Sequence, residues 1–575
     1  MSTTDHHPTR PARPARGRPP GLPGLIALAV AALLVAALVS SALVAAPPAQ
    51  AAITGPTVVS LTFDDGDADQ ATAQQAMASK GMAGTFYVTT GFTGASGYLT
   101  RQQLSSFAAA GNEIGGHTVT HADLTQVAST EAQAQICNGR KVLQDWGFKP
   151  TSFAYPFSTA NAAVEAQAAG CGYTTSRGLG DTRTRFSCGS CVRAETLPPA
   201  DPQYLRAPDQ VDSRWTLADL QGTVTGAANN GGGWVILTFH RVCAPTGTAS
   251  CPADRSITPT LFSQFTTWLD TYRKTTTNKT SVKTVDQVVR QYRGASYPAY
   301  SPASSVPAKP VAAAGANALL NDSLETTDAA TTFPQCFQPG GWGTNTAAWS
   351  SATPGRTGSK AEQLALSGYS SGDAKLLPTL DLQTCAPSVA PGATYDISTW
   401  YTSTAVSQFA LYYRDGSGAW FYWTSSPWFA ASATWAQARF TTPPVPAGAT
   451  AMTFGLALIA NGTLVTDDYG LYQAGTGPSA SAPPTTSSST SSSSTTTTES
   501  PSARQAPSSD ASTPAAGPSA RPGGPGGPQQ PPGPAGPPVL TKREHSKAKP
   551  YLPGGEALRP GTQVAVPPLR ADGKG

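Results

Sequence analysis

Residues 57–293 of this 575-residue chain alternate strand-like with helix-like runs, and this alternation constrains the fold more than any other feature. The strand-like runs are apolar or rich in β-branched residues: 58–63, 84–89, 152–155, 173–176 and 234–239. The helix-like runs are longer, and each stops directly before a glycine: 69–80, 100–110 and 129–146. Parallel strands joined by helical crossovers produce this order. We therefore expect an α/β fold for this part of the chain.

The histidines of the chain fall into two short motifs. Only three of the six lie between the apolar leader and the C-terminal tail. His117 and His121 are four residues apart, and His240 directly follows the last strand-like run. Asp64 and Asp65 directly follow the first one. Two imidazoles and one carboxylate are the ligand inventory of an open catalytic metal site, in which water takes the remaining position.

Four motifs carry a family resemblance. They are Thr62-Phe-Asp-Asp-Gly66, His117-Thr-Val-Thr-His121, Phe153-Ala-Tyr-Pro-Phe157 and Val235-Ile-Leu-Thr-Phe-His240. In this order they resemble the motifs of the NodB-type polysaccharide deacetylases, carbohydrate esterase family four. The resemblance covers about residues 57–293. It implies a distorted (β/α) barrel that removes N- or O-acetyl groups from a polysaccharide with a divalent metal, most often Zn²⁺.

The two adjacent carboxylates need different roles, because the side chains of successive residues normally diverge. The resemblance assigns Asp65, His117 and His121 to the metal and Asp64 to base catalysis. This division agrees with the chemistry, since a cation lowers the pKa of its bound water and a neighbouring carboxylate can accept the proton.

The remaining site residues are also assigned by resemblance. The backbone N–H of Phe157 would stabilise the oxyanion, and His240 would protonate the leaving group. We expect Tyr155 and Pro156 to line the substrate groove. Trp215 is assigned to the same groove through a loose match of residues 212–215 to a further motif of the family.

One departure from the family concerns the partner of the base. Many members carry an arginine shortly before the aromatic–proline pair, where it pairs with the catalytic carboxylate. Here the segment before Pro156 is Phe153-Ala154-Tyr155, without arginine. Arg177, Arg193 and Arg206 are the candidates to replace it, and the sequence does not separate them.

The N-terminus predicts export. Four arginines precede the apolar run 25–46, and Pro47-Pro48 and Ala49-Gln50-Ala51 follow it. This is the layout of a cleaved signal peptide, here residues 1–51. The alternative is an uncleaved membrane anchor, because the run is long enough to span a bilayer. In both cases the rest of the chain is extracellular, secreted or associated with the cell wall, and the leader is its only contact with a membrane.

Eight cysteines in an exported chain predict disulfides. Proximity in the sequence favours Cys188–Cys191 and Cys243–Cys251. Cys336 and Cys385 are the two cysteines of the second domain. Cys137–Cys171 would then join the helices that flank the third motif. A zinc ribbon or a redox site at Cys188-Gly-Ser-Cys191 is the alternative, but no second Cys-x-x-Cys accompanies it.

Composition divides the chain further. We expect a deacetylase domain at 52–295, a linker at 296–315, an all-β sandwich at 316–474, a disordered Ser/Thr/Pro/Gly-rich segment at 475–540 and a polar basic tail at 541–575. Seven of the eleven tryptophans lie in the sandwich. Because strand side chains alternate, the run Trp420-Phe-Tyr-Trp423 should direct at least two rings outward or into a groove. The sandwich is then either a carbohydrate- or wall-binding module or a purely structural domain.

The charge excludes one class of partner. The net charge is +4, and the excess of basic residues is concentrated in the two ends of the chain, so no basic face for nucleic acid is expected.

The sequence predicts a secreted polysaccharide deacetylase that acts on peptidoglycan, a chitin-like polymer or acetylated xylan. The rival hypothesis is a non-catalytic glycan-binding protein with a degenerate barrel.

Overall fold

The computed structural model describes residues 55–244, 251–275, 280–329, 331–478 and 563–564. The predicted signal peptide, nearly all of the Ser/Thr/Pro/Gly-rich segment and most of the basic tail lie outside the described residues. Within these ranges, no helix combines the length and the apolar composition needed to cross a membrane.

The first folded region is built on a parallel sheet with the strand order β5-β4-β3-β2-β1-β6, and β9 also pairs with β1. Its strands are β1 (Thr57–Phe63), β2 (Thr85–Val88), β3 (Glu113–Gly116), β4 (Ser152–Ala154), β5 (Thr175–Arg177), β6 (Gly233–Phe239) and β9 (Ser281–Val282). Every residue of β1 and β6 is buried, as expected for strands that are covered on both faces. The sheet is a curled half-barrel, which confirms the predicted α/β class.

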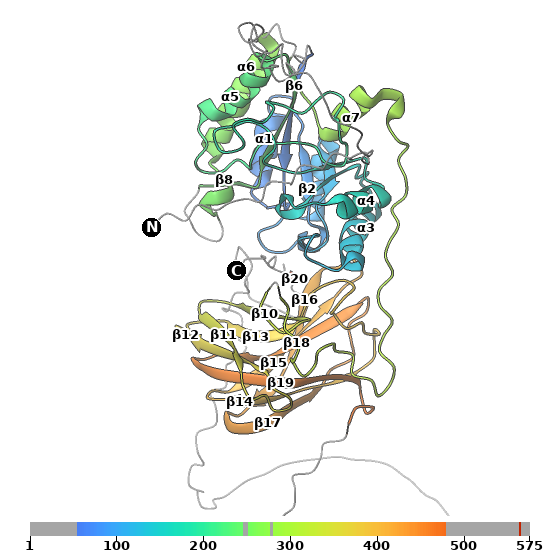
Figure 1. Cartoon of the computed structure of the whole chain (residues 1–575), viewed down its shortest axis with the longest axis vertical. Helices are drawn as coiled ribbons and strands as arrows, with labels where there is room; N and C mark the ends of the chain where they lie inside the picture. The colour runs from blue at the N-terminus through green and yellow to red at the C-terminus, as the bar shows by residue number, and fades with distance from the viewer. Residues whose placement is uncertain (1–54, 245–250, 276–279, 330, 479–562, 565–575) are drawn as a thin grey trace, which may run out of the picture. The chain divides into compact units, whose positions relative to one another are not determined.

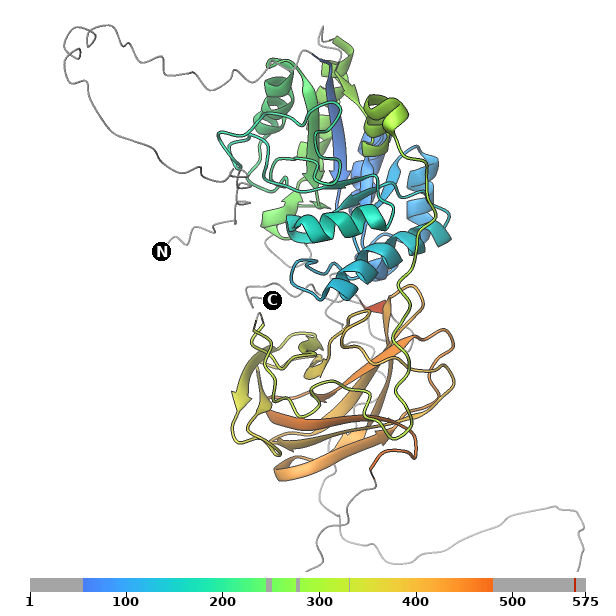
Figure 2. The same ribbon diagram turned by 45° about the vertical axis from the view of Figure 1, so that its right-hand side comes forward.

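Helices cover the outside of this sheet (Figures 1 and 2). They are α1 (Gln70–Ala78), α2 (Arg101–Ala109), α3 (Ser129–Asp145), α4 (Ala162–Gly170), α5 (Leu217–Ala228), α6 (Pro259–Thr275) and α7 (Val285–Arg293). Threonine capping boxes begin α2, α5 and α7, where Thr100, Thr216 and Thr284 each accept the backbone N–H three residues on. A small parallel pair, β7 (Arg241–Val242) and β8 (Ser256–Ile257), follows β6.

An irregular segment connects the two edges of the half-barrel. Glu195 bridges Trp234 of β6, and Leu205 bridges Arg177 of β5. The ion pair between Arg206 Nη2 and Glu195 Oε1, 2.7 Å long, lies in the same segment. In a closed barrel, further strands would lie between β5 and β6. Here this irregular segment, which makes isolated bridges to the two edge strands, takes their place, so the barrel is distorted.

The second folded region consists of two antiparallel sheets, with the strand orders β10-β13-β18-β15-β16-β20 and β11-β12-β19-β14-β17. The first sheet contains β10 (Phe337–Trp342), β13 (Asp373–Pro378), β15 (Ser407–Arg414), β16 (Trp420–Phe429), β18 (Ala451–Leu458) and β20 (Gln563–Val564). The second contains β11 (Thr346–Ala352), β12 (Ala361–Ser367), β14 (Tyr395–Ser403), β17 (Ser432–Thr441) and β19 (Gly462–Gln473). Leu364, Phe409, Phe454 and Leu471 belong to one buried core shared by both sheets, which confirms the all-β region.

The aromatic run in β16 divides in a way that its sequence only partly indicated. Trp420 and Trp423 are 1% and 8% exposed, whereas Phe421 and Tyr422 are half-buried. A register shift between β15 and β16 at Leu411 and Tyr412 changes the alternation, so the two tryptophans three residues apart are both covered. The tryptophans of this run are therefore unsuited to stack on a ligand.

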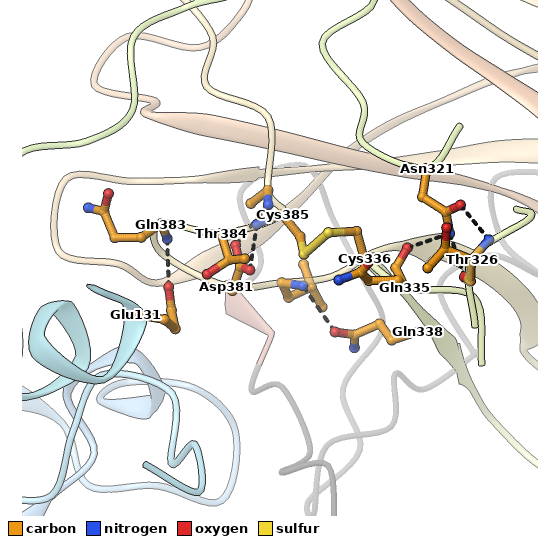
Figure 3. The surroundings of a disulfide bond; sticks show 12 residues. Glu131, Asn321, Thr326, Gln335, Cys336, Gln338, Asp381, Gln383, Thr384 and Cys385 are labelled. Carbon is orange, nitrogen blue, oxygen red and sulfur yellow. Dashed lines mark hydrogen bonds between the residues drawn. A yellow bond between two sulfur atoms is a disulfide. The ribbon is translucent and has the colours of Figure 1, made fainter. Parts of the chain in front are cut away.

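All four predicted disulfides are present: Cys137–Cys171, Cys188–Cys191, Cys243–Cys251 and Cys336–Cys385. No cysteine in the described ranges is free. Figure 3 shows Cys336–Cys385, where the Asp381 carboxylate accepts the backbone N–H groups of Cys385 and Ala386 at 2.7 Å each. The bridge and this carboxylate together hold the loop that follows β13.

Candidate metal centre and active site

The ends of β1 and β6 bring the first motif residues together. The two strands pair in parallel along their whole length, ending at Phe63 opposite Phe239. Asp64 and His240 therefore leave the sheet at the same edge, and the Asp64 N–H donates to the Phe239 carbonyl at 2.9 Å. The buried Gln70 ties both ends, because its Nε2 donates to the carbonyls of Asp64 at 2.5 Å and of His240 at 3.0 Å.

Three side chains converge on one point beside this edge. Nε2 of His117 lies 3.3 Å from Asp65 Oδ1, and Nε2 of His121 lies 3.2 Å from the same oxygen. Their ligand atoms all lie within 4.8 Å of one another, and among the described residues this is the group of His, Cys, Asp and Glu side chains that could hold a metal.

The chemistry of these donors fits a cation. His117 Nδ1 lies 2.8 Å from the Ala154 carbonyl oxygen, so Nδ1 carries the proton and the Nε2 lone pair is directed at Asp65. The buried Oδ1 of Asp65 accepts no hydrogen bond. Burial alone would raise the pKa of Asp65, but the charge of His121 and the closeness of both imidazoles hold that pKa well below its usual value. The three residues thus supply two imidazole nitrogens and an ionised carboxylate, which suit zinc or a similar divalent ion.

Left-handed backbone conformations are concentrated around these residues. Asp65, Thr118, His121 and Phe157 have φ angles of 72°, 65°, 59° and 56°. Non-glycine residues adopt this region rarely and at a cost of about 1–3 kcal/mol each. At His121 and Asp65 this conformation directs the side chains toward His117, so the strain lies where the cluster is formed.

The partner of Asp64 is Arg177. Its Nη2 lies 2.5 Å from Asp64 Oδ2, and both side chains are buried. Arg177 is the last residue of β5, and its guanidinium lies over the Tyr87 ring at 5.4 Å. Of the other two candidates, Arg206 pairs with Glu195, and Arg193 lies against α5 at Gly226. The structure therefore selects one of the three arginines that the sequence left open.

His240 lies near this pair without bonding to it. Its Nε2 is 3.9 Å from Asp64 Oδ2, and the buried Nδ1 has no hydrogen-bond partner. Burial lowers the pKa of His240, and the positive charge of Arg177 adds to the effect, although Asp65 and Asp64 oppose it.

The third motif divides between the site and the core. The Phe157 ring contacts the His121 ring at a centroid distance of 4.7 Å, so its side chain packs against the three-ligand cluster. Tyr155 is buried, with its hydroxyl donating to the Gln203 carbonyl, and Pro156 is buried. Trp215 is also buried, against Phe186. These are core contacts, and the assignment of Tyr155, Pro156 and Trp215 to substrate binding stays a prediction.

Sequence reasoning missed Gln70. It stands at the first position of α1, in an Ala/Gln-rich stretch where nothing distinguishes it from its neighbours. Its role depends on the pairing of β1 with β6, which brings two carbonyls separated by 176 positions within reach of one amide.

Comparison with known proteins agrees with this geometry. The polysaccharide deacetylase family matches residues 51–176, a range that contains Asp64, Asp65, His117, His121 and Phe157 but not His240. None of the curated proteins matches the chain.

Solved structures that are similar to parts of the chain include two deacetylases or esterases and one carbohydrate-binding module. The Streptococcus pyogenes deacetylase PplD in complex with acetate is 22% identical, with a TM-score of 0.22, over 26% of this chain and 63% of that one. The chain thus spans less than two thirds of that protein. A family 4 carbohydrate esterase from Streptomyces lividans is 18% identical, with a TM-score of 0.24, over 37% and 88%. A family 11 carbohydrate-binding module of Clostridium thermocellum is 11% identical, with a TM-score of 0.21, over 29% and 100%.

Proposed function

We propose that this chain, which contains a NodB-type polysaccharide deacetylase domain, is an exported hydrolase that removes acetyl groups from a glycan with the help of a divalent metal. The observation that supports this best is the convergence of Asp65, His117 and His121 beside the buried Asp64–Arg177 pair. A site that only bound glycan would not need two carboxylates in such different surroundings.

The metal would be held by Asp65 Oδ1 and by Nε2 of His117 and His121, and zinc is the ion that suits these ligands best. When bound, it supplies a Lewis acid that polarises the acetyl carbonyl and lowers the pKa of water. Asp64 is positioned by Arg177 and accepts the proton of the attacking water. Asp64 keeps this role because its Oδ2 is directed at Arg177 and not at the two histidines.

Two further groups complete the proposed reaction. The backbone N–H of Phe157, whose ring contacts His121, donates to the oxyanion of the tetrahedral intermediate. His240 donates a proton to the departing amine or hydroxyl. An amine needs this proton more than an alcohol does, because it is the poorer leaving group.

The rest of the chain fits an extracellular polymer substrate. Four disulfides are typical of exported proteins. We assign residues 52–295 to the catalytic domain, 296–315 to a linker and 316–474 to an accessory domain that holds the enzyme on polysaccharide or cell wall. Peptidoglycan, chitin-like polymers and acetylated xylan are the candidate substrates.

The test is acetate release from these three polymers by chelator-treated protein, with and without added Zn²⁺. We expect release that depends on the metal and is absent in Asp64→Asn. Metal-independent release would contradict the mechanism. No release from any acetylated glycan, with glycan binding retained, would favour the non-catalytic alternative.

A further inference from the structure

A groove on the second sheet of the sandwich is a site that the catalytic reaction does not use. Strands β14, β17 and β19 form its floor, and its volume is about 390 Å³. This lies within the range of about 300–1,000 Å³ that is usual for ligand sites. The three strands are neighbours in the order β19-β14-β17, with their outer face away from the shared core.

Strand alternation explains which side chains reach the groove. In β14 every second residue is buried, so Asp396, Ser398 and Trp400 point to the outer face. Their partners on β17 are Thr441, Arg439 and Gln437, which share that face.

On β19 the partners of Asp396 and Ser398 are Tyr472 and Gly470. A side chain on Gly470 would come within 2.7 Å of Ser398 Oγ and 3.0 Å of the Tyr472 ring, so glycine keeps the floor open between them.

The walls of the groove are already ordered. The Arg356 guanidinium lies 3.7 Å from the centre of the Trp400 ring and pairs with Asp468 at 2.7 Å. The Asp467 carboxylate accepts the Arg356 N–H at 2.7 Å, which fixes the loop that carries this arginine. A ligand would therefore meet a preorganised site at a small entropic cost.

The polar groups are paired with one another so that donors and acceptors stand side by side. Arg439 Nε donates to Gln437 Oε1 at 2.7 Å, and Thr441 Oγ1 donates to Asp396 Oδ1 at 2.6 Å. Vicinal hydroxyl groups of a sugar, each both donor and acceptor, match such pairs. Arg356 covers one face of the Trp400 ring, and the rest of this half-buried ring, together with the half-buried ring of Tyr472, offers apolar surface for the C–H face of a pyranose.

Charge narrows the ligand further. The lining contains the carboxylates of Asp322, Asp396 and Asp468 against the cations Arg356 and Arg439. Because the two signs of charge nearly cancel, the groove does not favour a polyanion, such as nucleic acid or a uronic acid polymer, or a polycation.

We propose that the groove binds a segment of a neutral polysaccharide, with Trp400 as the aromatic platform and with Gln437, Arg439 and Asp396 bonding to its hydroxyl groups. The proposal rests on the proposed function for the assignment of residues 316–474 as an accessory domain and for the choice of polymers. It places the binding surface on β14 and β17, away from the aromatic run Trp420–Trp423 of β16.

The experiment is a pull-down of the full chain carrying Asp64→Asn, so that no turnover alters the polymer. The polymers are insoluble chitin, peptidoglycan, xylan and cellulose, with alginate as the acidic comparison. We expect binding to at least one neutral polymer that is insensitive to salt, and a drop of about tenfold or more in Trp400→Ala and Arg439→Ala, as for residues at the centre of a site.

Trp428→Ala, a half-buried tryptophan on β16 of the other sheet, is the matched control and should bind like the parent. Gln437→Ala replaces a half-buried side chain and keeps the test valid if Trp400→Ala loses its fold. Equal binding by the parent and all three groove variants would overturn the proposal, and so would salt-sensitive binding to alginate alone. Binding that appears only after truncation at Pro478 would also overturn it, because a segment of the chain itself would then be the occupant.

Activity separates this proposal from the proposed function. The same groove variants are also made without Asp64→Asn, so that the catalytic residues are intact. These variants should release acetate from short soluble oligomers at the parental rate. Loss of activity on these oligomers together with binding would show that the sandwich acts on the catalytic domain and not on the polymer.

Discussion

Arg177 holds the carboxylate of Asp64, the base of the proposed reaction, from the opposite edge of the half-barrel: its Nη2 lies 2.5 Å from Asp64 Oδ2, with Asp64 following β1 and Arg177 ending β5. Between them stand β2, β3 and β4. The curl of the sheet is what allows this contact, since in a flat sheet the first and fifth strands would lie about 19 Å apart. The charge next to Asp64 thus comes from the end of β5 and not from the segment before Pro156.

Replacing Arg177 should reduce both catalysis and stability, since it breaks a buried ion pair. Arg177→Met leaves a buried carboxylate without its counter-charge, and we expect kcat/KM to fall by about 10–100-fold. Arg177→Lys keeps the charge and should recover part of the activity. The measurement is kcat/KM for acetate release by the three proteins. The control is Arg185→Met, at an exposed arginine paired with Asp219, and it should leave the rate unchanged.

Metal content should distinguish the two adjacent aspartates. Asp65→Ala, His117→Ala and His121→Ala each remove one of three ligands and should lose metal. Asp64→Asn is nearly isosteric and should keep about one equivalent while its rate falls about 10²–10⁴-fold. Elemental analysis and acetate release on the same preparations measure both. Loss of metal in Asp64→Asn would show that the roles are assigned wrongly.

His240→Ala should behave like the base variant in metal content but differ in its dependence on the leaving group. We expect metal to be retained and the rate to fall more on an N-acetyl than on an O-acetyl substrate, because the amine needs protonation to leave. The measurement is the ratio of the two rates relative to the parent. Full activity on an N-acetyl substrate would exclude His240 as the acid.

The sequence predicted the parts of this protein that local pattern determines. The helix starting after Thr100 and the strand ending at Phe63 follow from capping and β-branched runs, and the three-ligand cluster follows from motifs at strand ends. Contacts that depend on the pairing of strands far apart in the sequence could not be predicted from local pattern. The contact of Arg177 with Asp64 needs the curl of five strands, and the buried state of Trp423 needs the register shift in β16.

The buried Glu113, the first residue of β3, makes the free energy of unfolding depend on pH. Its Oε2 accepts hydrogen bonds from Thr85 Oγ1 at 2.9 Å and from the Asp286 N–H at 2.8 Å. Its Oε1 accepts from Ser152 Oγ at 2.5 Å. The carboxyl group thus joins β2, β3, β4 and α7. Burial, with a smaller contribution from the charge of Asp286, raises the pKa of Glu113 from 4.5 to about 7.

The sign of the pH effect follows from this shift. Between about pH 4.5 and 7 the unfolded chain has lost the proton of Glu113 while the folded protein keeps it. Unfolding therefore releases a proton in this range, and stability falls as the pH rises. A difference of this size corresponds to roughly 3 kcal/mol. Glu113→Gln cannot ionise, so the melting temperature of the wild type should fall relative to that of the variant from pH 4.5 to pH 7, and the gap should stay constant above. Asp145→Asn, at an exposed carboxylate on α3, is the control and should run parallel to the wild type at every pH. Parallel curves for wild type and Glu113→Gln would mean that the four elements around Glu113 hold it ionised throughout this range.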